Sequence, residues 1–268
     1  MVGSLLNGHS ELRMAKITRR EVFSKSGLLL AAAGATLPGL GFEGSEAASA
    51  KTWRIVVVGG HPDDPESGCG GTIALYSSLG HEVTILYLTR GEAGIRGKTH
   101  DEAAAIRTAE SEKACAILNA QPVFAGQIDG DTEVNRARYD SFRKILEGLR
   151  PDLVLTQWPI DSHRDHRVAS LMAYDAWLEG GKKFALYYYE VEQGEQTQVF
   201  HPTHYVDITE TESRKRAACF AHASQHPETD FWPQHDMMNR FRGMEIGVKY
   251  AEAFVRHDQS VPPGILGS

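Results

Sequence analysis

The sequence predicts a single α/β domain of the Rossmann-like type, with a mostly parallel sheet flanked by helices on both faces. Short β-branched runs alternate with longer segments of helical periodicity, which is the order expected of βαβ units. The runs are apolar at nearly every position, as is typical of strands covered on both faces. After residue 50 the sequence contains no internal repeat, low-complexity stretch or interdomain linker, so residues 51–268 are interpreted as one domain.

Residues 1–50 are predicted to be a signal peptide and are excluded from the fold. A charged region is followed by an uncharged stretch from Ser26 to Leu40 and then by an A-x-A pattern ending at Ala50, which is the layout of an export signal. A bilayer-spanning helix needs about 20 apolar residues. This stretch is shorter and is broken by glycine and proline, so no stable membrane anchor is expected.

The leader also contains an adjacent arginine pair, Arg19 and Arg20. The pair resembles a twin-arginine signal, although the lysine lies one place later than in the usual pattern. This resemblance implies the twin-arginine export machinery as a partner and a periplasmic or extracellular location. Met14 is an alternative start that would give a leader of more typical length.

The first half of the domain is predicted to contain three strands and three helices. Trp53–Gly59 is a β-branched run ending in glycine, and Val83–Thr89 and Asp152–Thr156 have the same character. Helices are predicted at about 67–80, 100–119 and 133–149, because apolar positions recur on one side of these segments. The last of them ends where Arg-Pro follows Leu149.

The second half is predicted to alternate less regularly. A helix is expected from about His163 to Leu178, followed by strands at Phe184–Glu190 and Thr203–Asp207. Two last helices are expected near 210–221 and 234–255. The tryptophans and tyrosines of this half are interpreted mainly as core residues, although aromatic side chains at a sugar-binding rim would give the same pattern; they are Trp158, Trp177, Trp232 and Tyr187–Tyr189.

Composition excludes several classes of protein. The chain has 28 Lys and Arg against 35 Asp and Glu, with a formal net charge of -7, so no basic surface for nucleic acid is expected. Hydrophobic residues make up 41% and charged residues 24%, which is ordinary for a globular protein. The three cysteines are widely spaced and do not suggest a disulfide framework. Among them Cys69 lies between glycines and is interpreted as a packing residue rather than a ligand or nucleophile.

The residues after the first predicted strand point to a cation site. Ligands of open parallel sheets bind outside the carboxyl ends of the strands, and here the chain reads Gly59-Gly-His61-Pro-Asp63-Asp64. Neither G-x-G-x-x-G nor a P-loop pattern is present. Two adjacent carboxylates would repel a pyrophosphate, whereas an imidazole and two aspartates suit a metal ion.

A second cluster of the same kind follows Asp152–Thr156. It contains His163 and His166, three residues apart at a predicted helix start, with Asp161 and Asp165 beside them. The spacing alone has a high false-positive rate, and the placement after a buried strand is what distinguishes this pair. The other histidine pairs are interpreted differently: His201 and His204 as a surface loop, and His222 and His226 as a solvated helix face or a substrate rim.

Four ordered motifs together resemble the PIG-L/LmbE family of zinc-dependent deacetylases. They are H-P-D-D after the first strand, a Gly-Gly-Thr helix, the turn Thr89-Arg-Gly-Glu-Ala-Gly94 and H-x-D-H before a helix. The likeness spans nearly all of residues 53–256.

The resemblance implies a role for each matching residue. His61, Asp64 and His166 would hold zinc, Asp63 would be the general base, and His163 would stabilise the oxyanion. Arg107, Asp129 and Glu92 match sugar-contacting positions. The chain departs from many relatives in having Pro65 before Glu66, and in having Asp161 where some relatives carry a mobile tyrosine, so the resemblance does not carry over that gating role.

The same chemistry follows from the residue types. Two imidazole nitrogens and one carboxylate leave the fourth position of a zinc ion open, as in catalytic sites. Zinc activates water and polarises a carbonyl, and a carboxylate that stays off the metal can accept the proton of the water. Asp165 is a candidate acceptor for a histidine N–H. The alternative for Asp63, Asp64 and Asp165 is an ordinary helix N-cap, and iron or cobalt would suit the same ligands.

Three functions are compatible with these residues. The preferred one is an exported zinc amidohydrolase that removes acetyl from an N-acetylglucosamine-type sugar or glycoconjugate. The second is a related metal-dependent amidase acting on a thiol-sugar conjugate. The third is a non-catalytic glycan-binding module, against which the presence of Asp63 argues, because binding alone does not require a general base.

Overall fold

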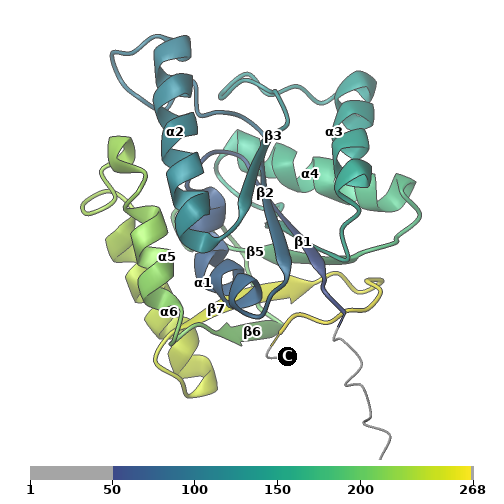
Figure 1. The fold of residues 1–268 in the computed structure, drawn as a ribbon, viewed down its shortest axis with the longest axis vertical. Coiled ribbons are helices and arrows are strands. Elements are labelled where there is room, and N and C mark those ends of the chain that lie inside the picture. Colours follow the sequence, from purple (N-terminus) through teal and green to yellow (C-terminus); the bar gives the residue numbers. More distant parts are fainter. Residues whose placement is uncertain (1–50, 267–268) are drawn as a thin grey trace, which may run out of the picture. The chain divides into compact units, whose positions relative to one another are not determined.

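The structure is a computed structural model that describes residues 51–266, and the predicted signal peptide with Arg19 and Arg20 lies outside them. Within the described residues the strands are β1 (Arg54–Gly59), β2 (Glu82–Tyr87), β3 (Gln121–Phe124), β4 (Leu153–Gln157), β5 (Ala185–Tyr189), β6 (His204–Asp207) and β7 (Ala251–Arg256). They form one sheet in the order β3-β2-β1-β4-β5-β7-β6 (Figure 1). The first five strands in this order pair in parallel, and β7 is antiparallel to both β5 and β6. The predicted fold class is confirmed.

Helices cover both faces of this sheet (Figure 1). On one face lie α1 (Asp64–Ser78), α2 (His100–Leu118) and α5 (Glu212–Cys219), with α6 (Trp232–Ile246) beside them, and on the other lie α3 (Arg136–Leu149) and α4 (Arg164–Glu179). Among the helices of residues 51–266, none combines the length and the apolar character needed to cross a bilayer.

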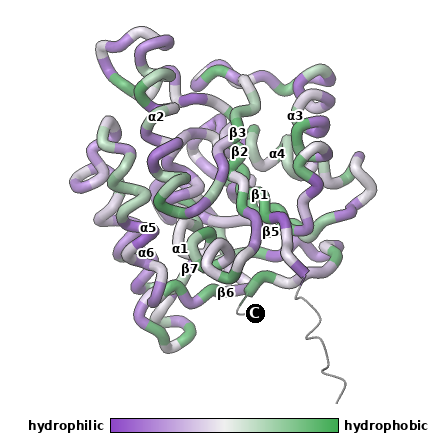
Figure 2. Tube along the Cα trace, in the orientation of Figure 1, coloured by the Kyte–Doolittle hydropathy of each residue, from purple (hydrophilic) through white to green (hydrophobic). Residues whose placement is uncertain are grey.

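Successive side chains of β1 point to opposite faces of the sheet and belong to two hydrophobic cores, one on each face. Ile55 and Val57 pack into the core beneath α1 and α2, whereas Val56 and Val58 pack into the core beneath α3 and α4. All four side chains are buried because a central parallel strand is covered on both faces. Hydrophobic stretches accordingly run through the middle of the molecule, and hydrophilic residues are frequent on the outer helices and loops (Figure 2).

One strand was missed and one predicted helix is partly wrong. The sequence analysis made no prediction for β3, because its four residues carry no clear pattern. The predicted helix at 234–255 is instead the helix α6, which ends at Ile246, followed by Gly247 with φ 77° and then the strand β7. The alanines and glutamate of β7 favour a helix locally, but pairing between β5 and β6 overrides this preference and buries Ala251–Phe254.

The strand order places a crevice at the carboxyl ends of β1 and β4. From β1 the chain continues outward to β2 and β3, whereas β4 lies on the other side of β1, so the order reverses between β1 and β4. This is the point at which open α/β sheets bind ligands. The two strand ends are also joined directly, because the backbone N–H of Gly60 donates to Oε1 of Gln157 at 2.8 Å.

Candidate metal centre and active site

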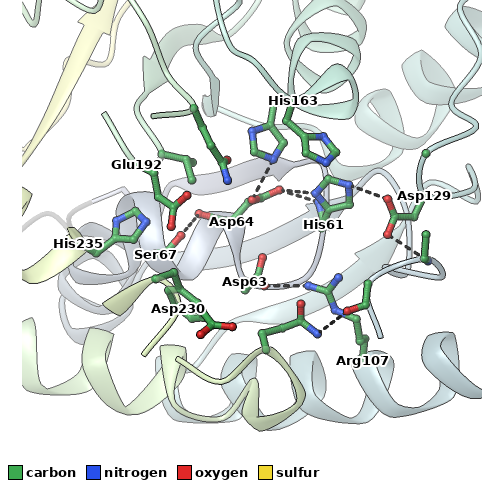
Figure 3. A pocket seen from close by; sticks show the side chains of 18 residues that line it. His61, Asp63, Asp64, Ser67, Arg107, Asp129, His163, Glu192, Asp230 and His235 are labelled. Atoms are coloured by element: carbon green, nitrogen blue, oxygen red, sulfur yellow. Dashed lines mark hydrogen bonds and ion pairs between the residues drawn. The ribbon is translucent and has the colours of Figure 1, made fainter. Parts of the chain in front are cut away.

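A pocket of about 590 Å³ opens at this crevice (Figure 3). Its lining comes from the loop after β1, the start of α4, the loop after β5, and the segment that leads into α6. Of the residues singled out from the sequence, the pocket wall contains His61, Asp63, Asp64, Arg107, Asp129, His163 and His166.

His61, Asp64 and His166 meet at the centre of the pocket. The carboxylate of Asp64 lies between the two rings, with Oδ2 at 3.2 Å from Nδ1 of His61 and Oδ1 at 3.2 Å from Nε2 of His166. All three side chains are buried. Burial disfavours the charged carboxylate, but His166 and His61 outweigh it and hold the pKa of Asp64 well below its usual range.

The far nitrogen of each ring faces another carboxylate. Nε2 of His61 lies 3.1 Å from Asp165 and 3.2 Å from Asp129, and Nδ1 of His166 lies 3.2 Å from Asp161. Burial lowers the pKa values of both histidines, but the carboxylates outweigh it, raising the pKa of His61 well above its usual value and that of His166 to about 9. When a metal ion is bound, a carboxylate on the far nitrogen would hold the ring proton there and leave the near nitrogen as the ligand. Nδ1 of His61 and Nε2 of His166 therefore face Asp64 as two nitrogen donors beside one carboxylate, a set that fits Zn²⁺.

Asp165 and Asp161 are themselves held in place. Asp165 accepts the N–H of Gly130 at 2.8 Å and the hydroxyl of Thr132 at 2.6 Å. Asp161 accepts the backbone N–H of His163 at 2.8 Å and the hydroxyl of Thr197 at 3.0 Å. The residue that replaces the mobile tyrosine of some relatives is thus buried and bonded on both oxygens.

Asp63 lies across the pocket from the histidine rings, with one carboxylate oxygen joined to Arg107 (Figure 3). Its backbone has φ 100°, which is uncommon outside glycine and is found at functional sites. The carboxylate accepts from Nη2 of Arg107 at 2.8 Å, and the same nitrogen donates to the carbonyl of Pro62. Burial raises the pKa of Asp63 to about 6 although Arg107 opposes the shift.

Arg107 reaches Asp63 across the turn after β2. A Cβ on Gly91 or Gly94 of this turn would overlap the guanidinium, and Gly91 also has φ 70°. The glycines of the T-R-G-E-A-G motif therefore make room for Arg107.

His163 packs against both other histidine rings. Its ring centroid lies 4.6 Å from that of His166 and 4.6 Å from that of His61, and ring nitrogens of the three lie within 4.8 Å of one another. Nδ1 of His163 accepts the N–H of Asp165 at 3.3 Å, which places the proton of a neutral ring on Nε2. Burial and the neighbouring histidines lower the pKa of His163, which favours this neutral donor form.

Asp129 and Glu92, the other two residues expected to contact the sugar, differ in their position relative to the pocket. Asp129 lines the pocket, where it also accepts the N–H of Ala93 at 3.2 Å. Glu92 does not line it, because its carboxylate accepts the backbone N–H groups of Arg90 and Asp129 at 3.1 Å each. Glu92 holds the loop that carries Asp129 and does not line this pocket.

The interpretation of His222 as a solvated or rim residue is wrong. His222 is fully buried, with Nε2 at 3.1 Å from Oε1 of Glu66. The same oxygen accepts the hydroxyl of Tyr87 at 2.5 Å, and Oε2 accepts the backbone N–H of Asp63 at 3.2 Å. His226 is exposed, as is His201. Cys69 is buried and unpaired, in agreement with a packing role.

The lining also contains residues that were not singled out from the sequence, among them Gln225, Glu192, Asp230 and His235. Glu192 follows β5, so the strand-end rule that found His61 could have found it. The other three lie in the segment from the end of α5 into α6 and carry no local signal, because this segment reaches the pocket from outside the parallel sheet.

His235 is expected to make stability depend on pH. Burial lowers its pKa to about 3, whereas the unfolded chain protonates it near 6.5. Between these values only the unfolded state gains the proton, so stability is lost as the pH falls. The free energy of unfolding can be measured with urea at pH 7 and at pH 5.5 for the unmodified chain and for His235→Gln. Between these two pH values it should fall by about 1 kcal/mol more in the unmodified chain than in the variant. Equal losses in both proteins would contradict the buried neutral state.

Comparison with known proteins gives the family. The profile of PIG-L, GlcNAc-PI de-N-acetylase, matches residues 56–177. Diacetylchitobiose deacetylase of Thermococcus kodakarensis is 30% identical over an alignment of 220 positions, which covers 74% of this chain and 81% of that protein. The solved structure of N,N'-diacetylchitobiose deacetylase from Pyrococcus horikoshii has a TM-score of 0.67 at 27% identity, over 76% of this chain and 83% of that one.

A further solved structure is similar to this chain in fold only. The structure of GalB, the 4-carboxy-2-hydroxymuconate hydratase of Pseudomonas putida, has a TM-score of 0.70 at 24% identity and covers 80% of this chain and 99% of that one. The fold is therefore shared with an enzyme of another reaction class, and the reaction has to be argued from the site. By its sequence relatives and its fold, the chain belongs to the PIG-L family of deacetylases.

Proposed function

We propose that this chain is a zinc-dependent N-deacetylase that releases acetate from an N-acetylglucosamine-type sugar or glycoconjugate. The observation that carries the proposal is the arrangement of His61, Asp64 and His166. The carboxylate of Asp64 lies between Nδ1 of His61 and Nε2 of His166. The other ring nitrogen of each histidine lies beside a second carboxylate. The deacetylases named above, which act on diacetylchitobiose, support the substrate class.

His61, Asp64 and His166 would hold the zinc ion. When bound, zinc supplies a Lewis acid that polarises the acetyl carbonyl and makes a water acidic enough to attack it. The chain would supply three ligands, which would leave a further coordination position for water and substrate.

Asp63 is the proton acceptor in this proposal. Asp63 is not one of the proposed zinc ligands, and Arg107 bonds to its Oδ2 alone, so its other oxygen could take the proton of the attacking water. Asp63 then returns the proton to the leaving amine, which completes hydrolysis to acetate and a free amino sugar. Its pKa of about 6 suits both steps near neutral pH.

His163 stabilises the negative charge that develops on the carbonyl oxygen. With Nδ1 bonded to the N–H of Asp165, the Nε2–H of the neutral ring is available to donate. Removal of one such donor typically costs about 10²–10³ in kcat.

The test is acetate release by the purified zinc-loaded protein. We expect release from N-acetylglucosamine glycosides, its loss after chelation, and recovery when zinc is restored. A protein that binds zinc stoichiometrically but releases acetate from none of these glycosides would contradict the proposal and favour another amide or a binding module.

We further propose that residues 1–50 direct export through the twin-arginine route, on the strength of Arg19-Arg20 followed by the uncharged stretch. Replacing both arginines by lysine should retain the protein in the cytoplasmic fraction of expressing cells. Unchanged export of this variant would contradict the route.

A further inference from the structure

The backbone of Asp63 has a conformation that its surroundings must maintain. Its φ of 100° lies in the region that favours glycine, and such a conformation persists only when neighbouring contacts hold it. The carbonyl of Asp63 accepts the N–H of Ser67 at 2.8 Å, as expected at the start of a helix. The N–H of Asp63 donates to Oε2 of Glu66 at 3.2 Å. Glu66 is therefore a side chain that holds the backbone of Asp63.

Glu66 is held in turn from two other parts of the fold. Its side chain lies in the first turn of α1 and is 0% exposed. Oε1 accepts the hydroxyl of Tyr87, at the end of β2, at 2.5 Å and lies 3.1 Å from Nε2 of His222, which follows α5. Both partners are also fully buried, and we call the three residues the buried trio. With Oε1 held from two sides, Oε2 keeps its direction toward the N–H of Asp63.

The charge of His222 favours this arrangement. Burial lowers the pKa of His222, but the carboxylate of Glu66 outweighs burial and raises the pKa above its usual value. A protonated ring beside a carboxylate forms a stronger contact than a neutral one. His222 therefore helps to keep Glu66 in place.

The segment that carries His222 is anchored to the helix that carries Arg107. The N–H and the hydroxyl of Ser224 donate to the carboxylate of Glu110 in α2, at 2.7 and 2.6 Å. Arg107 lies three positions earlier on α2 and donates to Oδ2 of Asp63. The support of the Asp63 backbone and the support of its carboxylate are therefore joined through α2.

An ordinary helix cap does not need a buried trio. At the start of α2, the N–H of Thr99 donates to Oε2 of Glu102 at 2.9 Å, and the side chain of Glu102 is exposed. Burial of charged groups brings little net stability, because the cost of desolvation offsets their attraction. The buried trio is therefore explained better by the geometry that it imposes on Asp63 than by a gain in stability.

On the basis of the proposed function, we propose that Glu66 is a positioning residue that acts through Asp63, and that the other members of the buried trio support it. Arg107 bonds to Oδ2 of Asp63 alone (Figure 3), so the direction of the other oxygen depends also on the backbone that carries the side chain. The bond between Glu66 and the N–H of Asp63 fixes that backbone. Without this bond Asp63 would keep its carboxylate but lose the alignment of the oxygen that accepts the proton.

The test is a double-mutant cycle between Glu66 and Asp63. In the zinc-loaded enzyme, Glu66→Ala should lower kcat for acetate release from N-acetylglucosamine glycosides by about 10²-fold, the effect of moving a reacting group by about 1 Å. KM and zinc content should stay as in the unmodified enzyme, because Glu66 neither lines the pocket nor belongs to the proposed ligands. Added to Asp63→Asn, which has no base left to position, Glu66→Ala should leave kcat unchanged.

Several results would overturn the positioning role. A loss of kcat by the same factor in both backgrounds would show that Glu66 acts on the pocket as a whole and not through Asp63. A change confined to KM, or a loss of zinc, would also overturn it. Glu66→Gln keeps an oxygen for the N–H of Asp63 and should recover most of the kcat lost in Glu66→Ala, so equal activity of these two variants would count against the role. Absence of acetate release by the unmodified zinc-loaded chain would instead overturn the proposed function, and the positioning role with it.

A smaller change provides a second test, because removal of a buried carboxylate leaves its partners unpaired. Tyr87→Phe removes only the hydroxyl that donates to Glu66, and kcat should fall by about tenfold, the effect of one lost hydrogen bond. The fall should again disappear in Asp63→Asn. The matched control is Glu102→Ala, which removes an ordinary capping carboxylate and should keep full kcat. An unchanged kcat in Tyr87→Phe, or a fall in Glu102→Ala as large as that in Glu66→Ala, would contradict positioning by the buried trio.

Discussion

Asp63→Asn is expected to lower kcat by about 10²–10⁴ while the bound zinc is retained. Asparagine keeps the size of the side chain and an oxygen for Arg107, but it cannot accept a proton from water. The proposed zinc ligands are His61, Asp64 and His166, so metal content should not change. Single-turnover acetate release and metal analysis on the same preparation measure both quantities.

The control is Asp131→Asn, which changes an exposed aspartate outside the pocket. This control should keep full activity. An Asp63→Asn protein with more than a tenth of the normal kcat would remove Asp63 from the proton-transfer step. Loss of zinc from this variant would instead assign Asp63 to the metal site.

Lys215→Met is expected to destabilise the protein by about 3–5 kcal/mol. Nζ of Lys215 lies 2.7 Å from Oε1 of Glu252, and both side chains are essentially inaccessible to solvent. The other contacts of Glu252 are the backbone N–H groups of Gly71 and Thr72 in α1, at 2.9 and 2.7 Å. Methionine fills similar volume but leaves the carboxylate buried without its cation.

Denaturant unfolding of the full chain measures this loss. The matched control is Lys51→Met, since Lys51 forms an exposed pair with Asp152 at 2.7 Å, for which a change below about 1 kcal/mol is expected. The double variant Lys215→Met with Glu252→Gln should recover much of the stability, because it removes the uncompensated charge. Similar losses in the two single lysine variants would contradict the account of a buried pair.

The core of the candidate site could be predicted because it depends on strand ends. Buried β-branched runs locate β1 and β4, and the parallel arrangement brings the residues that follow them together. His61 and His166 could therefore be placed in one pocket although about a hundred positions separate them. Asp165 could be expected beside them for the same reason, and it lies 3.1 Å from Nε2 of His61.

Other features depend on tertiary contacts that leave no local pattern. The sequence of β7 favours a helix, and only its pairing with β5 and β6 makes it a strand. His222 could not be recognised as buried, because Glu66 meets it from a distant helix. His235 and Asp230 enter the pocket from a segment outside the parallel sheet, so no rule based on strand ends applies to them.

The contact between His61 and Asp165 joins positions 104 residues apart. The two residues meet only because β4 pairs with β1, which brings the loop after β1 beside the start of α4. The proposed ligand set is therefore complete only when β4 is paired with β1, so the set as a whole would capture a metal ion only in the folded chain. If the proposed leader directs a folded chain across the membrane, the cytoplasm rather than the final compartment would determine which metal the enzyme carries.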